Sequence, residues 1–156
     1  MTSDRISILL HDIDFGYPKE TPPKYGEITV ETTWDGAGIS SDFDGKGWWE
    51  ISADLLQANY DALPLFTARA YYYYLPAYLI NALRDFSPRN YVLEFVVYSL
   101  SPTKTKSDDP SISERRNQFS TSEKALIRRF LLLILEDENM FLLFNDAERG
   151  LRKFWA

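Results

Sequence analysis

The chain has 156 residues, of which 45% are hydrophobic and 15% aromatic, and its formal net charge is −6. This length predicts one packed domain over residues 1–156, and the absence of cysteine excludes disulfides, thiol catalysis and cysteine-ligated zinc. No stretch has the roughly eighteen consecutive apolar residues of a membrane span, and the first apolar run lacks the basic flank of a signal peptide. We therefore expect a cytoplasmic protein that does not bind membranes.

The charge is unevenly distributed along the chain. Residues 1–64 carry twelve acidic and four basic side chains, whereas residues 65–156 carry eleven and thirteen. An acidic surface repels phosphate backbones, so we expect no nucleic-acid partner and favour an electropositive protein partner. The plainer alternative is that the acidity serves solubility alone.

The N-terminal part predicts one helix and a long loop. Apolar residues recur at three- and four-residue spacing between Arg5 and Phe15, which predicts a helix there. Proline and glycine then punctuate an acidic sequence over residues 16–47, which predicts an extended loop. Within this loop, only residues 27–33 alternate like a β-strand.

The middle of the chain predicts three helices. Two leucines and a tyrosine between residues 53 and 60 suit a short helix that Pro64 ends. Thr67 can cap a tyrosine-rich helix over residues 68–85, with a kink at Pro76. Residues 90–100 have strand-like composition but helical spacing, and the neighbouring helices favour a helix.

The C-terminal part predicts a loop and two helices. Residues 101–118 are polar and aperiodic, which indicates a surface loop. Ser120 and Glu123 match a capping box that opens a helix to about Glu136, and Asn145 with Glu148 suggests the same for a last helix ending at Trp155. The predicted fold is mainly α: a compact bundle of five to six helices, in which a helix and an acidic loop (1–47) precede a helical core (48–156).

Three pieces of the chain resemble a known family. Residues 66–79, FTARAYYYYLPAYL, are similar to the signature of a family of small bacterial proteins known only as a domain of unknown function, in which phenylalanine precedes an A-x-x-Y-Y-L-P-A-Y-L helix. The remaining matches lie in the C-terminal half: Phe119, Ser120, Glu123, Ile127, Phe130 and Leu131 in one piece, and Ala147, Leu151, Phe154 and Trp155 in the other. The resemblance spans residues 48–156. It implies a helical fold and a bacterial origin, and it supplies no catalytic residues.

His11 is the only histidine, and it lies beside two carboxylates in the sequence His11-Asp12-Ile13-Asp14. Imidazole next to carboxylates suits a metal site or a general base. On a helix, however, His11 and Asp12 are about 100° apart, so we expect only Asp14 to be within reach and interpret this segment as a solvated helix end. We assign no catalytic residue, no metal ligand and no cofactor.

An acidic segment with paired tryptophans is the favoured partner-binding site. Trp48 and Trp49 face different directions on any regular element, so we expect one in the core and leave open an exposed position for the other. Carboxylates surround them in the sequence. The candidate site consists of Asp35, Asp42, Asp44, Trp48, Trp49 and Glu50.

A basic group near the C-terminal half has a different interpretation. It contains Arg115, Arg116, Lys124, Arg128 and Arg129, with acidic residues interspersed. The mixed signs indicate a solvated helix face in place of a phosphate site.

The leading hypothesis is a non-enzymatic protein-binding domain, specifically an immunity- or antitoxin-like inhibitor whose carboxylates cover an electropositive surface of a bacterial toxin. Two alternatives stay open. One is a small enzyme, with or without a metal, that uses His11 and nearby carboxylates. The other is a ligand-binding or scaffold module built on the tyrosine-rich helix.

Overall fold

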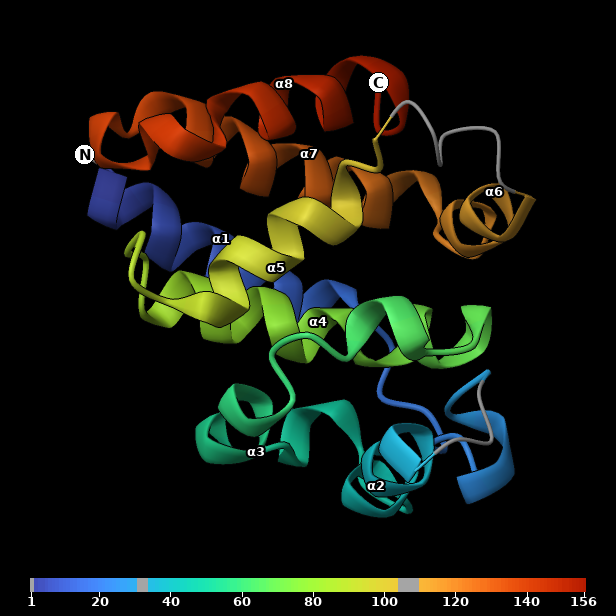
Figure 1. Ribbon diagram of the computed structural model, residues 1–156. Helices are drawn as coiled ribbons and strands as arrows, with labels where there is room; N and C mark the ends of the chain where they lie inside the picture. The colour runs from blue at the N-terminus through green and yellow to red at the C-terminus, as the bar shows by residue number, and fades with distance from the viewer. Residues whose placement is uncertain (1, 31–33, 104–109) are drawn as a thin grey trace.

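The computed structural model describes residues 2–30, 34–103 and 110–156, which form eight α-helices and four 3-10 helices (Figure 1). The α-helices are α1 (Thr2–Gly16), α2 (Trp34–Phe43), α3 (Ala53–Ala58), α4 (Ala68–Arg84), α5 (Tyr91–Leu100), α6 (Pro110–Asn117), α7 (Thr121–Glu136) and α8 (Phe144–Lys153). The 3-10 helices are η1 (Tyr25–Glu27), η2 (Trp48–Glu50), η3 (Leu63–Leu65) and η4 (Glu138–Leu143). The mainly α prediction is confirmed, whereas the count of five to six helices is wrong.

The tyrosine-rich helix α4 is the centre of the fold. Twelve of its seventeen residues are buried, and it contacts α1, α3, α5, α6, η2 and η3. Figure 1 shows it between the α2–α3 end of the molecule and the α7–α8 pair. The Thr67 hydroxyl caps it by accepting a hydrogen bond from the Ala70 amide at 3.1 Å, as the sequence predicts.

Three of the five tyrosine hydroxyls of α4 bind backbone carbonyls of the N-terminal region, whereas Tyr71 contacts Ser99 of α5 and Tyr72 donates to Glu123 of α7. The Tyr74 hydroxyl lies 2.9 Å from the Phe43 carbonyl and 3.0 Å from the Lys46 carbonyl, both at the end of α2. The Tyr78 hydroxyl donates to the Asn59 carbonyl at 2.7 Å, and the Tyr73 hydroxyl to the Glu20 carbonyl at 2.7 Å. The Phe43 and Asn59 carbonyls also accept from the Lys46 and Ala62 amides, each at 3.1 Å, so the tyrosines add a second hydrogen bond there and join α4 to distant turns.

The C-terminal half packs through periodic apolar faces. Helix α7 buries leucine, isoleucine and phenylalanine side chains against α1 and α8, and α1 contributes Leu9 and Ile13 to the same core. The predicted capping box is present at its start: the Ser120 hydroxyl accepts from the Glu123 amide at 3.1 Å, and the Glu123 carboxylate accepts from the Ser120 amide at 2.7 Å. Helix α5 confirms the choice of helix for residues 90–100.

Two predictions for the N-terminal loop are wrong. Helix α2 forms where we expected extended chain, because Ile39 and Phe43 lie one turn apart and are both buried in the core, which outweighs the low helix propensity of the glycines around them. The predicted strand over residues 27–33 is an isolated bridge between Thr29 and Phe66, because the partner segment turns into α4 at once. Residues 31–33 of that prediction lie outside the described residues.

Two predictions for the C-terminal half also need correction. Part of the loop expected over residues 101–118 is helix α6, which begins with Pro110 at its first position, where a proline fits. Residues 104–109 lie outside the described residues. Helix α8 follows η4 directly and begins at Phe144 after Leu143, with no side-chain cap, so Asn145 lies inside the helix.

Candidate functional site

The predicted acidic residues lie at opposite ends of α2. Asp35 is exposed near its start, about 10 Å along the helix axis from Asp42. Asp42 and Asp44 flank its end, where the Asp42 carboxylate accepts a hydrogen bond from the Asn59 amide at 3.1 Å. The structure therefore separates Asp35 from the other predicted residues.

The two tryptophans are divided between the core and the surface, and the expected core position belongs to Trp48. Trp48 is 2% exposed, and its indole N–H donates to the Pro18 carbonyl at 3.0 Å. Trp49 is 42% exposed, and its ring stands nearly perpendicular to that of Trp48 at 5.9 Å between centroids. Trp49 is thus the aromatic side chain of this pair that a partner can reach.

Gly47 leaves room for the Trp49 ring against the backbone. A Cβ atom on Gly47 would lie 2.7 Å from two atoms of that ring, closer than side chains pack. The Gly47 amide also donates to the Glu50 carboxylate at 3.4 Å. The missing side chain lets the exposed indole lie across the backbone next to a carboxylate.

A cleft of about 280 Å³ lies beside Trp49, between η2, α3 and α4. Its charged lining residues are Asp14, Arg84 and Asp85. Asp14 and Asp85 add carboxylates to the predicted set. Sequence analysis missed them because they come from the ends of two helices, α1 and α4, that are far apart along the chain.

Amide side chains form the polar part of this cleft. The Gln57 amide nitrogen donates to the side-chain oxygens of Asn81 at 3.2 Å and Asn90 at 3.0 Å. The Asn90 oxygen also accepts from the Val92 amide and so caps α5. These contacts join α3, α4 and the start of α5 below the exposed indole.

His11 lies on α1, with its side chain 79% exposed and stacked on Phe15. Its Nδ1 atom is 3.5 Å from an Asp12 oxygen, so the expectation that only Asp14 would be within reach is wrong. The His11 and Asp12 side chains are flexible enough to approach each other even though they start about 100° apart on the helix. The other Asp12 oxygen accepts from Arg129 at 2.8 Å, and this hydrogen bond lowers the pKa of Asp12 below its usual value.

Within the described residues, no group of three or more histidine and carboxylate side chains is arranged to hold a metal ion. Within the same ranges, no helix is long and apolar enough to cross a membrane. The prediction that the protein uses no metal or cofactor remains a prediction.

Comparison with known proteins gives one match. A model of a family of unknown function, DUF6714, matches residues 21–156. The chain belongs to this family. No curated protein and no solved structure matches the chain.

The DUF6714 match confirms the resemblance to a family of unknown function and extends it. We expected the likeness to cover residues 48–156, but the match also includes η1 and α2. Most residues that line the cleft beside Trp49 therefore lie within the range that the family model matches. Asp14 is an exception, because α1 precedes the matched range.

Proposed function

We propose that this DUF6714 protein is a non-enzymatic protein-binding domain that engages an electropositive partner. The proposed contact is the Trp49 surface, which we define as Asp14, Asp42, Asp44, Trp49, Glu50 and Asp85. The observation that carries the proposal is the exposed Trp49 indole, which lies over Gly47 beside a cleft whose charged residues are Asp14, Arg84 and Asp85. Tryptophan in such surroundings is frequent among residues that dominate binding energy.

The chemistry of this surface favours a lysine or arginine side chain of the partner. A cation is attracted both by the face of an indole ring and by nearby carboxylates. The chain already contains this combination: the Lys19 ammonium lies 5.0 Å from the Trp48 ring centroid and 3.4 Å from an Asp14 oxygen. Trp49, with Glu50 and Asp85 nearby, offers the same groups to a partner.

A toxin inhibitor is the specific role that we propose. Inhibitors of this kind cover electropositive active sites, and opposite charges accelerate their association. The excess of acidic residues in residues 1–64 fits such a role, as does the short length of the chain. A bacterial origin and a cytoplasmic location belong to the same proposal.

Affinity capture with paired charge variants tests the proposal. The bait is the full chain, and the lysate comes from the organism that carries the gene. The variant Glu50→Lys/Asp85→Lys changes the Trp49 surface, whereas Asp35→Lys/Glu114→Lys changes the net charge equally at exposed positions outside it. We expect the control variant to retain the partner and the surface variant to lose it.

The captured partner then allows a kinetic measurement. We expect its association with the wild-type chain to slow as salt increases, because charges separated by more than about 8 Å are screened at physiological ionic strength. Replacing Trp49 with alanine should weaken binding by about 2 kcal/mol or more. Equal binding by both double variants, together with salt-independent association, would exclude this surface.

A further inference from the structure

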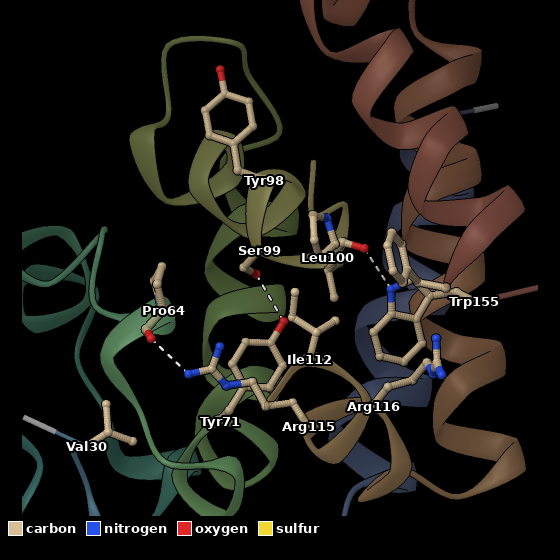
Figure 2. A pocket seen from close by; sticks show the side chains of 12 residues that line it. Val30, Pro64, Tyr71, Tyr98, Ser99, Leu100, Ile112, Arg115, Arg116 and Trp155 are labelled. Carbon is tan, nitrogen blue, oxygen red and sulfur yellow. Dashed lines mark hydrogen bonds between the residues drawn. The ribbon is translucent and has the colours of Figure 1, made fainter. Parts of the chain in front are cut away.

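A second cavity, of about 620 Å³, lies away from the Trp49 surface, between α4, α5, α6 and the C-terminal residues (Figure 2). It is more than twice the volume of the cleft beside Trp49. None of the residues that define the Trp49 surface lines it. Its volume lies within the range of about 300–1,000 Å³ that is typical of small-molecule sites.

The walls of this cavity are mainly apolar. Leu100, Ile112 and Phe154 contribute aliphatic and aromatic surface, and Trp155 contributes its indole ring. The Trp155 N–H is satisfied inside the protein, because it donates to the Leu100 carbonyl at 2.9 Å. A bound molecule would therefore meet the apolar part of that ring.

Arg115 is a cation fixed in this cavity. Its Nη2 atom donates to the carbonyls of Pro64 and Phe66, both at 2.8 Å, and its guanidinium carbon lies 5.6 Å from the centroid of the Tyr71 ring (Figure 2). The structure shows that this arginine is not a freely solvated side chain. It is held by its neighbours before any ligand arrives, with other N–H groups left to donate.

Tyr71 forms a stable support under Arg115. The Ser99 hydroxyl donates to the Val96 carbonyl at 2.9 Å, so in the 3.1 Å contact between Tyr71 and Ser99 the tyrosine is the donor. Burial raises the pKa of Tyr71 to about 12, which keeps its hydroxyl neutral near pH 7. The ring therefore places no negative charge beside the guanidinium.

Arg116 is the second cation of the cavity. It is half-buried, and its side chain makes no hydrogen bond or ion pair with any residue that the structure describes. The described residues that line the cavity also include no aspartate or glutamate. In a protein of net charge −6, an apolar cavity thus holds two arginines without a carboxylate.

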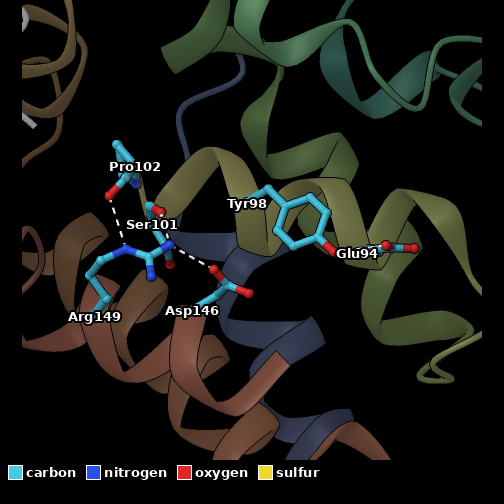
Figure 3. Close-up of polar contacts among 6 residues, drawn as sticks. All are labelled: Glu94, Tyr98, Ser101, Pro102, Asp146 and Arg149. Carbon is cyan, nitrogen blue, oxygen red and sulfur yellow. Dashed lines mark hydrogen bonds and ion pairs between the residues drawn. The ribbon is translucent and has the colours of Figure 1, made fainter. Parts of the chain in front are cut away.

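The wall formed by the end of α5 is held by α8 (Figure 3). Arg149 donates to the carbonyls of Ser101 at 2.7 Å and Pro102 at 3.0 Å, and it pairs with Asp146 at 2.6 Å. The charge of Arg149 is therefore neutralised within the protein. Arg149 thus differs from Arg116, whose side chain has no such partners among the described residues, and its contacts with Ser101 and Pro102 fix the chain that follows α5.

We propose that this cavity binds a small amphipathic anion, whose apolar body lies against Leu100, Ile112 and Trp155 and whose carboxylate or phosphate group binds Arg116, while Arg115 adds positive charge on the Pro64 side of the cavity (Figure 2). Guanidinium groups recognise both headgroups by charge-assisted hydrogen bonds. The apolar walls select against free inorganic phosphate and small polar acids, because burial of apolar surface supplies the remaining affinity.

Calorimetric titration of the full chain with three ligands of equal chain length tests this proposal. The ligands are decanoate, decyl phosphate and 1-decanol. We expect saturable binding of at least one anion at one site per chain, and about tenfold or more weaker binding of the alcohol, because it lacks the charge that the arginines recognise. The anion that binds more tightly identifies the headgroup.

Matched variants locate the site. Arg116→Gln should weaken anion binding about tenfold or more without unfolding the chain, since the Arg116 side chain makes no hydrogen bond with the described residues. Arg89→Gln, at an exposed position outside the lining, should leave anion binding unchanged. Trp49→Ala should also leave anion binding unchanged, so this test is independent of the proposed protein partner. Absence of saturable anion binding, equal binding of decanol, or an unchanged affinity in Arg116→Gln would overturn the proposal.

Discussion

The regions on the two sides of α4 are held to it by different forces. On one side, α1, α7 and α8 pack through leucine, isoleucine and phenylalanine side chains that recur with the helical period. On the other, residues 17–30 and 34–60 form short helices and turns whose carbonyls accept hydrogen bonds from tyrosines of α4. The first kind of packing follows from the spacing of apolar residues within each helix, whereas the second depends on residues that are distant in the sequence.

The difference between the two sides of α4 explains why this helix is rich in tyrosine. A phenylalanine would supply the same apolar ring, but it would leave the carbonyls of Phe43, Lys46 and Asn59 without these donors. The Phe43 and Asn59 carbonyls would keep the Lys46 and Ala62 amides as partners, so each lost tyrosine hydrogen bond should cost about 0.5–1.5 kcal/mol. The tyrosines therefore provide core volume and also attach the region that carries Trp49.

Alkaline pH should have the largest effect on the tyrosine-held side. Burial raises the pKa of Tyr71 to about 12 and also raises the pKa values of Tyr74 and Tyr78. Above pH 10 these tyrosines ionise in the unfolded chain but not in the folded one, so stability is complete below pH 10 and is lost as pH rises through 12. Each such tyrosine should lower the free energy of unfolding by about 1.4 kcal/mol per pH unit in this window.

Tyrosinate absorbance and far-UV circular dichroism, recorded together, measure this effect. We expect the buried tyrosines to ionise only as the helical signal is lost. Ionisation of all tyrosines near pH 10 with the helices intact would show that α4 is less buried than the structure indicates.

Removing a buried side chain from α4 should destabilise the packing on both sides of this helix. Leu75 is fully buried, and Leu75→Ala should lower the free energy of unfolding by about 2–5 kcal/mol. Leu142, which is exposed, is the matched control, and Leu142→Ala should change it by about 0.5 kcal/mol or less. Urea denaturation checks both values; similar losses for the two variants would contradict the assigned burial.

Helix capping on the periodic side should have a smaller effect. Ser120→Ala removes the cap of α7 and should cost about 1 kcal/mol. Asn145→Ala should cost about 0.5 kcal/mol or less, because Asn145 is an exposed residue inside α8 and not its cap. Thermal unfolding of the two variants distinguishes these positions, and an equal loss in both would restore the sequence-based assignment of Asn145.

Much of the helical structure on the side of α1, α7 and α8, and α4 itself, can be predicted from the sequence. The capping box of α7 and the uncharged run of α4 predict their helices closely, because local hydrogen bonds and apolar spacing determine them. Helix α2 could not be predicted in this way, since glycines lower its propensity and the contacts that stabilise it, such as the burial of Ile39 and Phe43, are with distant residues.

The candidate sites show the same division. The paired tryptophans and nearby acids were visible in the sequence, as was the division of the tryptophans between core and surface. The contributions of Asp14 and Asp85 to the cleft were not, because they depend on how α1 and α4 pack. Arg115 appeared to belong to a solvated face, but its contacts with the Pro64 and Phe66 carbonyls place it in a cavity.

The central claim is that tyrosine hydroxyls of α4 hold the N-terminal helices, and with them the Trp49 surface, in place. Hydrogen–deuterium exchange of Tyr74→Phe/Tyr78→Phe tests it most directly, with Tyr98→Phe as the control because the Tyr98 hydroxyl binds the Glu94 side chain on its own helix. We predict faster amide exchange in residues 34–60 of the double variant and unchanged exchange in α7 and α8. Unchanged exchange throughout, or an equal increase in both regions, would contradict the claim.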